Sequence, residues 1–302
     1  MLQVMKVVNF GIVAVLLFFH GCSIYILAST KELRKNRFIV LVLYLSLSDI
    51  ALGLEFIYHN VLRLMDLQGA TFQYQCMVIL HLACGTFIWS LIQTLLICLE
   101  RLNATFTIKK GLLVHLTSNK CVVFCFTLCH SIAVLRIGID MIDGPVPCDP
   151  KNSTIPLILF TQDIPCVGVV VSIISCYGVV VYRMTHPHKS VQTSGVTTSQ
   201  SAKKMADKIR MRKSIITLGL IIALVVVVLL LRGIALFIFY MGNESKINDT
   251  LFMIINNVFI MLNPLLDPVI YILRIKTYRD HLRCKCIKRN SVSDVSNLAT
   301  HS

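Results

Sequence analysis

Seven long apolar runs constrain the fold of this sequence more than any other feature. A membrane-spanning helix needs about 20 apolar residues, and each run is close to that length. The chain is 56% hydrophobic and only 15% charged, whereas soluble domains are about 25% charged. The alternation and regular turns of a β-barrel do not occur in these runs. The sequence therefore predicts an all-α membrane bundle with spans at residues 7–28, 38–64, 76–101, 121–139, 157–182, 214–241 and 251–273.

Lysine and arginine are distributed unevenly over the connecting segments, and their distribution predicts the topology. They are frequent in the first, third and fifth loops and after the last span, but sparse in the other loops. Because cytoplasmic loops carry the excess of positive charge, the N-terminus is predicted to lie outside and the C-terminus inside. The same placement accounts for the net charge of +14 without a nucleic-acid partner. We expect one transmembrane domain at residues 1–290 and a disordered cytoplasmic tail at 291–302.

Candidate modification sites fit this topology. An N-x-[ST] sequon, which predicts glycosylation, begins at each of three outside asparagines: Asn152, Asn243 and Asn248. Of the twelve cysteines, only Cys76 and Cys148 lie at outside positions. An oxidising environment favours a disulfide between them, and two free thiols are the alternative. Cys284 and Cys286 follow the last span among basic residues, a pattern typical of palmitoylation.

Several polar residues share one depth inside the predicted spans. Counted from the cytoplasmic ends of their helices, Asp49, Ser90 and Asn263 each lie 11 residues deep, which is about 17 Å. Asp267 lies about one turn lower. Two carboxylates close together in a low dielectric cannot both stay ionised without a cation, and otherwise one of them holds a proton. Oxygen ligands suit a hard cation, and we expect sodium because it is abundant; a shared proton and two separately hydrogen-bonded packing residues are the alternatives.

Ionisable residues also lie in the outer halves of the spans, where they imply a water-filled cavity or internal pairing. Glu55, His59, Asp163 and Arg232 are the candidates for lining a ligand pocket, and Arg136 is charged in the same outer halves. Apolar residues flank Arg232 on both sides. It is therefore expected either to pair with Asp163 or Glu55 or to contact an anionic ligand.

Four short motifs stand at matching distances from one another. They are Asp267-Pro268-Val269-Ile270-Tyr271 (N/D-P-x-x-Y), Leu45-Ser46-Leu47-Ser48-Asp49 (L-x-x-x-D), Glu100-Arg101-Leu102 (D/E-R-Y, 24 residues after Cys76) and Tyr278-Arg279, which opens a basic amphipathic segment. With seven spans and an outside N-terminus, the chain resembles the rhodopsin-like (class A) G-protein-coupled receptors over nearly its whole length. The end of the last span is faintly similar to chemosensory and odorant-type receptors.

The resemblance implies a seven-helix receptor of the plasma membrane with an amphipathic eighth helix at residues 275–286. An extracellular small molecule, anionic or lipid-like, would open the cytoplasmic helix ends to a heterotrimeric G protein; arrestin and receptor kinases are further candidate partners. The residues implied in coupling are Glu100, Arg101, Asp207, Pro268 and Tyr271. Asp49, Ser90, Asn263 and Asp267 occupy the family's sodium positions. Ala83 stands where amine receptors carry an aspartate, which argues against a biogenic amine.

Two departures from the family pattern bear on mechanism. Gly21-Cys22 stands where the first helix usually has Gly-Asn, and the sixth span lacks its proline and the C-W-x-P motif.

Glu100 and Arg101 are adjacent in the sequence, and adjacent residues do not face each other on a helix. Arg101 is therefore expected to reach a partner other than Glu100.

Two other classes of function compete with a receptor. A cation transporter or channel could use Asp49 and Asp267 as a relay, but the internal repeats common in transporters are not visible in the sequence. A membrane-embedded enzyme is not expected, because the sequence contains no nucleophile motif or metal-ligand spacing.

Overall fold

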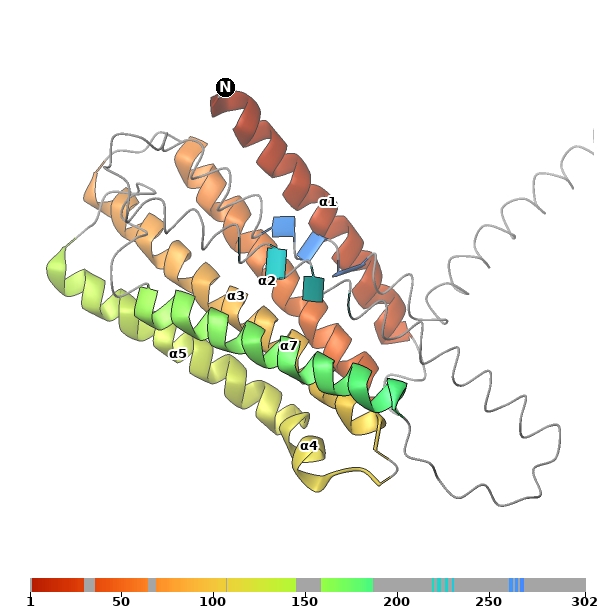
Figure 1. Cartoon of the computed structure of the whole chain (residues 1–302). Coiled ribbons are helices and arrows are strands. Elements are labelled where there is room, and N and C mark those ends of the chain that lie inside the picture. The colour runs from red at the N-terminus through yellow and green to blue at the C-terminus, as the bar shows by residue number, and fades with distance from the viewer. Residues whose placement is uncertain are drawn as a thin grey trace, which may run out of the picture.

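The computed structural model describes five stretches of the chain and isolated positions beyond them. The stretches are residues 2–29, 36–64, 69–106, 108–144 and 159–186, and the isolated positions are 219, 222, 223, 226, 227, 230, 261, 262, 264, 265, 267 and 268. These residues are almost entirely helical, and no strand occurs among them (Figure 1). The elements are α1 (Leu2–Ser29), α2 (Arg37–Leu64), α3 (Ala70–Ala104), α4 (Gly111–Leu116), α5 (Asn119–Asp143), the π-helical turn η3 (Leu159–Asp163) and α7 (Ile164–Thr185).

Five of these helices are long and apolar enough to cross a membrane: α1, α2, α3, α5 and α7. The predicted all-α fold class is thereby confirmed for the described residues, and the five membrane-capable helices overlap the first five predicted spans. By length and composition the chain is a multi-pass membrane protein. The sixth and seventh predicted spans are described only at the isolated positions. The eighth helix at 275–286 and the tail at 291–302 lie outside the described residues, so the full seven-helix bundle stays a prediction.

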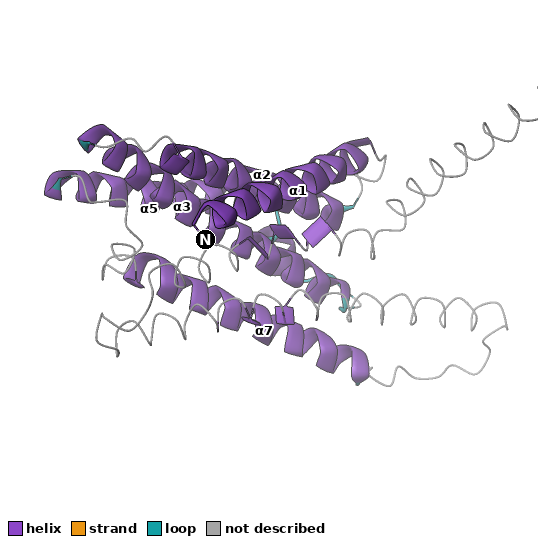
Figure 2. Cartoon of the chain, turned by 90° about the horizontal axis from the view of Figure 1, so that it is seen from above, coloured by secondary structure: helices purple, strands orange, loops and turns teal. Residues whose placement is uncertain are grey.

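The helix α3 forms the centre of the described bundle. It packs against α2, α5 and α7, while α1 packs against α2 (Figures 1 and 2). In its most apolar window 61% of the residues of α3 are buried, against 22% in α5. The outward face of α5 is therefore available to lipid, whereas α3 can carry polar groups at several depths inside the protein.

Two glycines let neighbouring helices approach closely. A Cβ atom added at Gly53 of α2 would lie 3.1 Å from a methyl carbon of Leu16 in α1, and one added at Gly85 of α3 would lie 3.1 Å from the Cβ of Ala133 in α5. Small residues have this role in membrane bundles, where close backbone packing contributes most of the attraction between helices. Gly53 therefore sets how closely α1 and α2 approach each other, and Gly85 does the same for α3 and α5.

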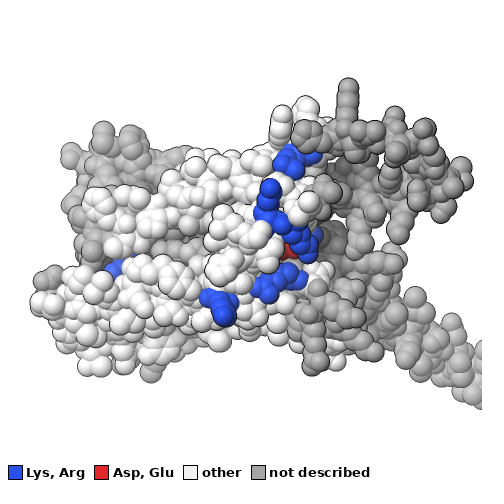
Figure 3. All heavy atoms as spheres, turned by 90° about the horizontal axis from the view of Figure 1, so that it is seen from below, with Lys and Arg blue, Asp and Glu red and all other residues white. Residues whose placement is uncertain are grey.

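Basic side chains gather at one end of the bundle, where α2 and α5 begin and α3 and α7 end (Figure 3). Arg37 donates from Nε to the carbonyl oxygen of Thr117 over 2.7 Å, and the guanidinium of Arg183 lies 4.0 Å from the ring centroid of Phe106. These contacts join helix ends that are far apart in the sequence. The clustering agrees with the charge pattern from which an inside location is predicted for this end.

Candidate functional site

The structure brings Asp49 of α2 and Ser90 of α3 together in the middle of the bundle. The Ser90 hydroxyl donates to Asp49 Oδ1 over 2.9 Å, and both residues are almost completely buried, at 0% and 1% exposed. A carboxylate at this depth needs donors from the protein, because lipid offers none. Neighbouring antiparallel helices place the two residues at one depth, as their equal distance from the helix ends predicts.

Asp267, from the last apolar run, is the second carboxylate of this site. It is 2% exposed, and its carboxyl group lies within hydrogen-bond reach of that of Asp49. Two carboxyl groups this close share a proton or a cation, because they cannot both stay ionised in a low dielectric. Asn263, the fourth residue of the predicted sodium site, lies outside the described residues. Three of the four predicted members are therefore brought together by the structure.

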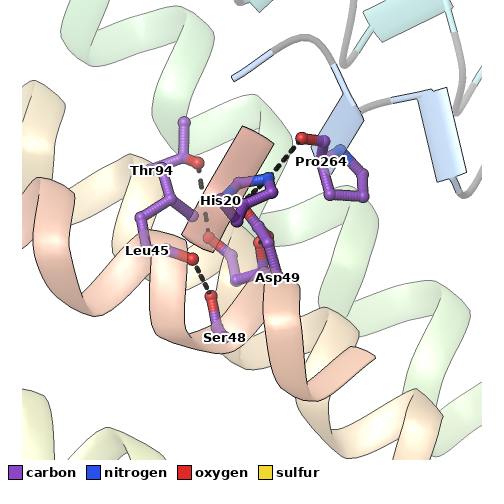
Figure 4. A network of polar contacts seen from close by, with 7 residues as sticks. His20, Leu45, Ser48, Asp49, Thr94 and Pro264 are labelled. Carbon is purple, nitrogen blue, oxygen red and sulfur yellow. Dashed lines mark hydrogen bonds and ion pairs between the residues drawn. The ribbon is translucent and has the colours of Figure 1, made fainter. Parts of the chain in front are cut away.

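His20 of α1 is a fourth member that the sequence argument missed. Its Nε2 atom lies 2.6 Å from the carbonyl oxygen of Pro264 and 3.6 Å from Asp49 Oδ2, and the residue is fully buried (Figure 4). Because a carbonyl oxygen can only accept, Nε2 carries the hydrogen and donates it. We call His20, Asp49, Ser90 and Asp267 the carboxylate cluster.

Proline chemistry explains why the last apolar run needs His20. In an α-helix the carbonyl of residue i accepts from the N–H of residue i+4. Positions 264 and 268 are both helical, but Pro268 has no N–H to donate to the Pro264 carbonyl. The imidazole of His20 supplies that donor from α1, so the first helix is fastened to the last apolar run at its proline.

The carboxylate cluster keeps unused acceptor capacity. Oδ2 of Asp49 and Oδ2 of Asp267 are buried without a hydrogen-bond partner, as is Nδ1 of His20. The hydroxyls of Ser48 and Thr94 do not donate to these carboxylate oxygens, because they donate to the carbonyls of Leu45 and Ser90 in their own helices (Figure 4).

The oxygen donors of Asp49, Asp267 and Ser90 fit a hard cation chemically. Among the described residues, no three His, Cys, Asp or Glu side chains converge on a metal-binding geometry. A sodium site here would therefore draw on hydroxyl and amide oxygens as well as on the two carboxylates.

A second group of buried ionisable residues lies between α3 and α5. His81 Nε2 is 2.5 Å from Asp140 Oδ2. Arg136 lies one turn before Asp140 on the same face of α5, is 2% exposed, and is close enough to His81 for their charges to interact. Its Nε and Nη2 atoms make no hydrogen bond. We call His81, Arg136 and Asp140 the outer cluster.

The candidate ligand-pocket residues lie at different contacts. Glu55 accepts a hydrogen bond from the Thr86 hydroxyl over 2.9 Å, and its Oε2 atom is buried without a partner. His59 Nδ1 lies 3.8 Å from Cys76 Sγ, and Ala83 packs against the apolar core. Asp163 is partly buried at the end of η3.

Arg101 contacts both its sequence neighbour and another helix. Its Nε atom lies 3.6 Å from Glu100 Oε2, although adjacent residues do not face each other on a helix. Both side chains are long and only partly buried, and they can bend toward the same helix end although their Cβ atoms diverge. The guanidinium also covers the ring of Phe38 in α2, 3.6 Å from its centroid, and this cation–π contact ties the end of α3 to the start of α2.

Cys76 takes part in a disulfide, whereas the eight other described cysteines are free thiols. Its predicted partner Cys148 lies outside the described residues, so the pairing itself stays a prediction. The same holds for the other predicted positions that the structure does not describe: Asn152, Asp207, Arg232, Asn243, Asn248, Tyr271, Cys284 and Cys286.

A comparison of the chain with protein-family models and with curated proteins finds no match to either.

Proposed function

We propose that this chain is a G-protein-coupled receptor of the rhodopsin-like kind. A small extracellular ligand binds in the outer half of the bundle and shifts a two-state equilibrium of the helices. The inner helix ends then open, and Arg101 contacts a heterotrimeric G protein. Receptor kinases and arrestin would act on the activated form at the plasma membrane.

The observation that carries this proposal is the carboxylate cluster. It ties α1, α2, α3 and the last apolar run together through His20, Asp49, Ser90 and Asp267. Buried ionisable groups in membrane spans are expensive and mark functional sites. A polar junction beside a proline, with acceptors still unused, supports a role as an element whose arrangement changes.

The test is recruitment of a panel of G-protein α subunits by the expressed chain under a broad small-molecule library. We expect a ligand-dependent signal that Arg101→Ala abolishes at matched surface level. Arg183→Ala is the matched control, because Arg183 is an arginine at the same end of the bundle but outside the Glu100-Arg101 motif. A signal unaffected by Arg101→Ala would contradict the proposed coupling.

The ligand is proposed to be anionic or lipid-like and to contact Arg232, with Glu55, His59, Ala83 and Asp163 nearby. Arg232→Ala should then lose the ligand response while surface expression persists. Lost expression would instead identify Arg232 as half of a structural pair.

The unused carboxylate oxygens also favour a second candidate, a cation transporter or channel. In this case Asp49 and Asp267 would relay a cation across the bundle. Sodium flux into proteoliposomes that Asp49→Asn abolishes, together with no recruitment of any G protein, would support this candidate over the receptor.

A further inference from the structure

The segment of residues 108–120, between α3 and α5, exposes apolar and basic side chains together. Ile108 is 81% exposed and Leu112 is 71% exposed. Three lysines of the same segment are also exposed: Lys109, Lys110 and Lys120. A basic segment with exposed aliphatic residues is typical of a membrane-interface element.

The positive charge of this segment is not compensated nearby. No acidic residue occurs in the sequence between Glu100 and Asp140. Within the part of the chain that the structure describes, none of the three lysines forms an ion pair with a carboxylate. Other basic side chains gather at this end of the bundle (Figure 3), where Arg37 begins α2 and Arg183 lies in the last turn of α7.

The segment is held in place beside a lipid-facing helix. The Lys110 N–H donates to Asn103 Oδ1 over 2.9 Å, and Arg37 holds the Thr117 carbonyl. The helix α5 begins directly afterwards, and its residues Val123 and Phe124 are 57% and 64% exposed. The exposed apolar side chains of the segment therefore lie next to the start of a helix that is long and apolar enough to cross a membrane.

We propose that residues 108–120 bind the headgroup of an anionic phospholipid. Lys109, Lys110 and Lys120 contact its phosphate and carboxylate oxygens, while Ile108 and Leu112 enter the boundary of the acyl chains. A membrane lipid fits this surface better than a soluble protein, because the exposed apolar residues continue toward the lipid-facing start of α5. This site does not depend on the proposed receptor activity.

The test is native mass spectrometry of the purified full-length chain with an equimolar mixture of phosphatidylserine and phosphatidylcholine. We expect phosphatidylserine adducts to exceed phosphatidylcholine adducts. The variant Lys109→Gln/Lys110→Gln/Lys120→Gln should lose the preference, by about fivefold for each lysine that contacts the lipid. The matched control Lys203→Gln/Lys204→Gln/Lys208→Gln, which removes the same charge elsewhere, should keep it.

A photoactivatable phosphatidylserine tests the position of the site without any substitution. Crosslinks should map to residues 108–120 and decrease as ionic strength rises. Equal adducts of the two lipids, crosslinks outside this segment, or equal losses in both triple variants would overturn the proposal. The proposal also fails if the Lys109, Lys110 and Lys120 variant keeps its lipid preference but loses G-protein recruitment, because the surface would then be a protein-docking surface.

Discussion

The carboxylate cluster and the outer cluster are both buried among membrane helices, but their charges are balanced differently. The outer cluster combines one carboxylate, Asp140, with the arginine Arg136 and with His81. The carboxylate cluster combines two carboxylates, Asp49 and Asp267, with one histidine and no arginine or lysine.

This difference is the basis for expecting a structural role of the outer cluster and a bound cation or proton in the carboxylate cluster. Buried charges persist where they are paired, and removing one partner of a buried pair is strongly destabilising. The outer cluster holds one basic and one acidic residue on α5, Arg136 and Asp140, and Asp140 contacts His81 of α3. The carboxylate cluster brings two carboxyl groups together without an arginine or lysine, and a proton or a cation between them would offset their repulsion.

The largest expected effect comes from breaking the outer cluster. Asp140→Leu breaks the His81–Asp140 pair and leaves the outer cluster with no acidic residue beside the buried Arg136, which should cost about 3–5 kcal/mol of stability. The measurement is thermal unfolding of the purified chain. The double variant Arg136→Leu/Asp140→Leu should recover most of the loss, because no unpaired charge remains. If the double variant is as unstable as the single one, the loss comes from the His81–Asp140 contact and not from the charge of Arg136.

The α3–α5 contact that positions the outer cluster can be tested next. Gly85→Val places a side chain against Ala133 and the Cys129 carbonyl, and such overpacking should cost about 1–3 kcal/mol. Gly138→Val is the matched control on α5, where an added Cβ meets nothing within 4 Å. Equal melting temperatures of the two variants would mean that α3 and α5 do not approach as closely as the structure has them.

His20 can be tested through the donor that it provides. His20→Ala leaves the Pro264 carbonyl buried without a partner, which should cost about 1–3 kcal/mol. His20→Asn can present an amide donor on a shorter side chain, and it should recover part of that loss. Thermal unfolding of the two variants side by side checks this. If alanine and asparagine are equally tolerated, the His20–Pro264 hydrogen bond does not stabilise the fold.

The last variant should change stability least and should raise it, and it distinguishes the carboxylate cluster from the outer cluster most clearly. Asp49→Asn removes one of two repelling carboxylates, and we expect it to raise stability by about 0.5–2 kcal/mol. The isosteric Asp140→Asn in the outer cluster should lower stability instead. If a cation binds the cluster, sodium should raise the melting temperature of the unmodified chain more than potassium does, and Asp49→Asn should abolish the difference. A chain that melts identically in the two salts would count against a sodium site.

Much of this architecture follows from local sequence features. Apolar runs of spanning length predict helices because lipid cannot satisfy a free backbone. The equal depth of Asp49 and Ser90 follows from residue counts along antiparallel helices, and the structure places these side chains in contact. On α1 the core-facing stripe Val13, Leu16, His20, Ser23 and Leu27 repeats at helical spacing. That stripe was the signal from which His20 could have been found.

The pairing of particular side chains was decided only by the tertiary structure. The sequence determines that the Pro264 carbonyl lacks a donor from Pro268, but not that α1 supplies one. It contains His81 and Asp140, but only the rotation of α3 and α5 about their axes brings them within 2.5 Å. Arg101 and Glu100 are neighbours whose pairing depends on flexible side chains beyond their Cβ atoms. Hydrophobic periodicity fixes which elements form and roughly how deep each residue lies. Contacts between polar groups depend on helix rotation and packing distance, which no single helix encodes.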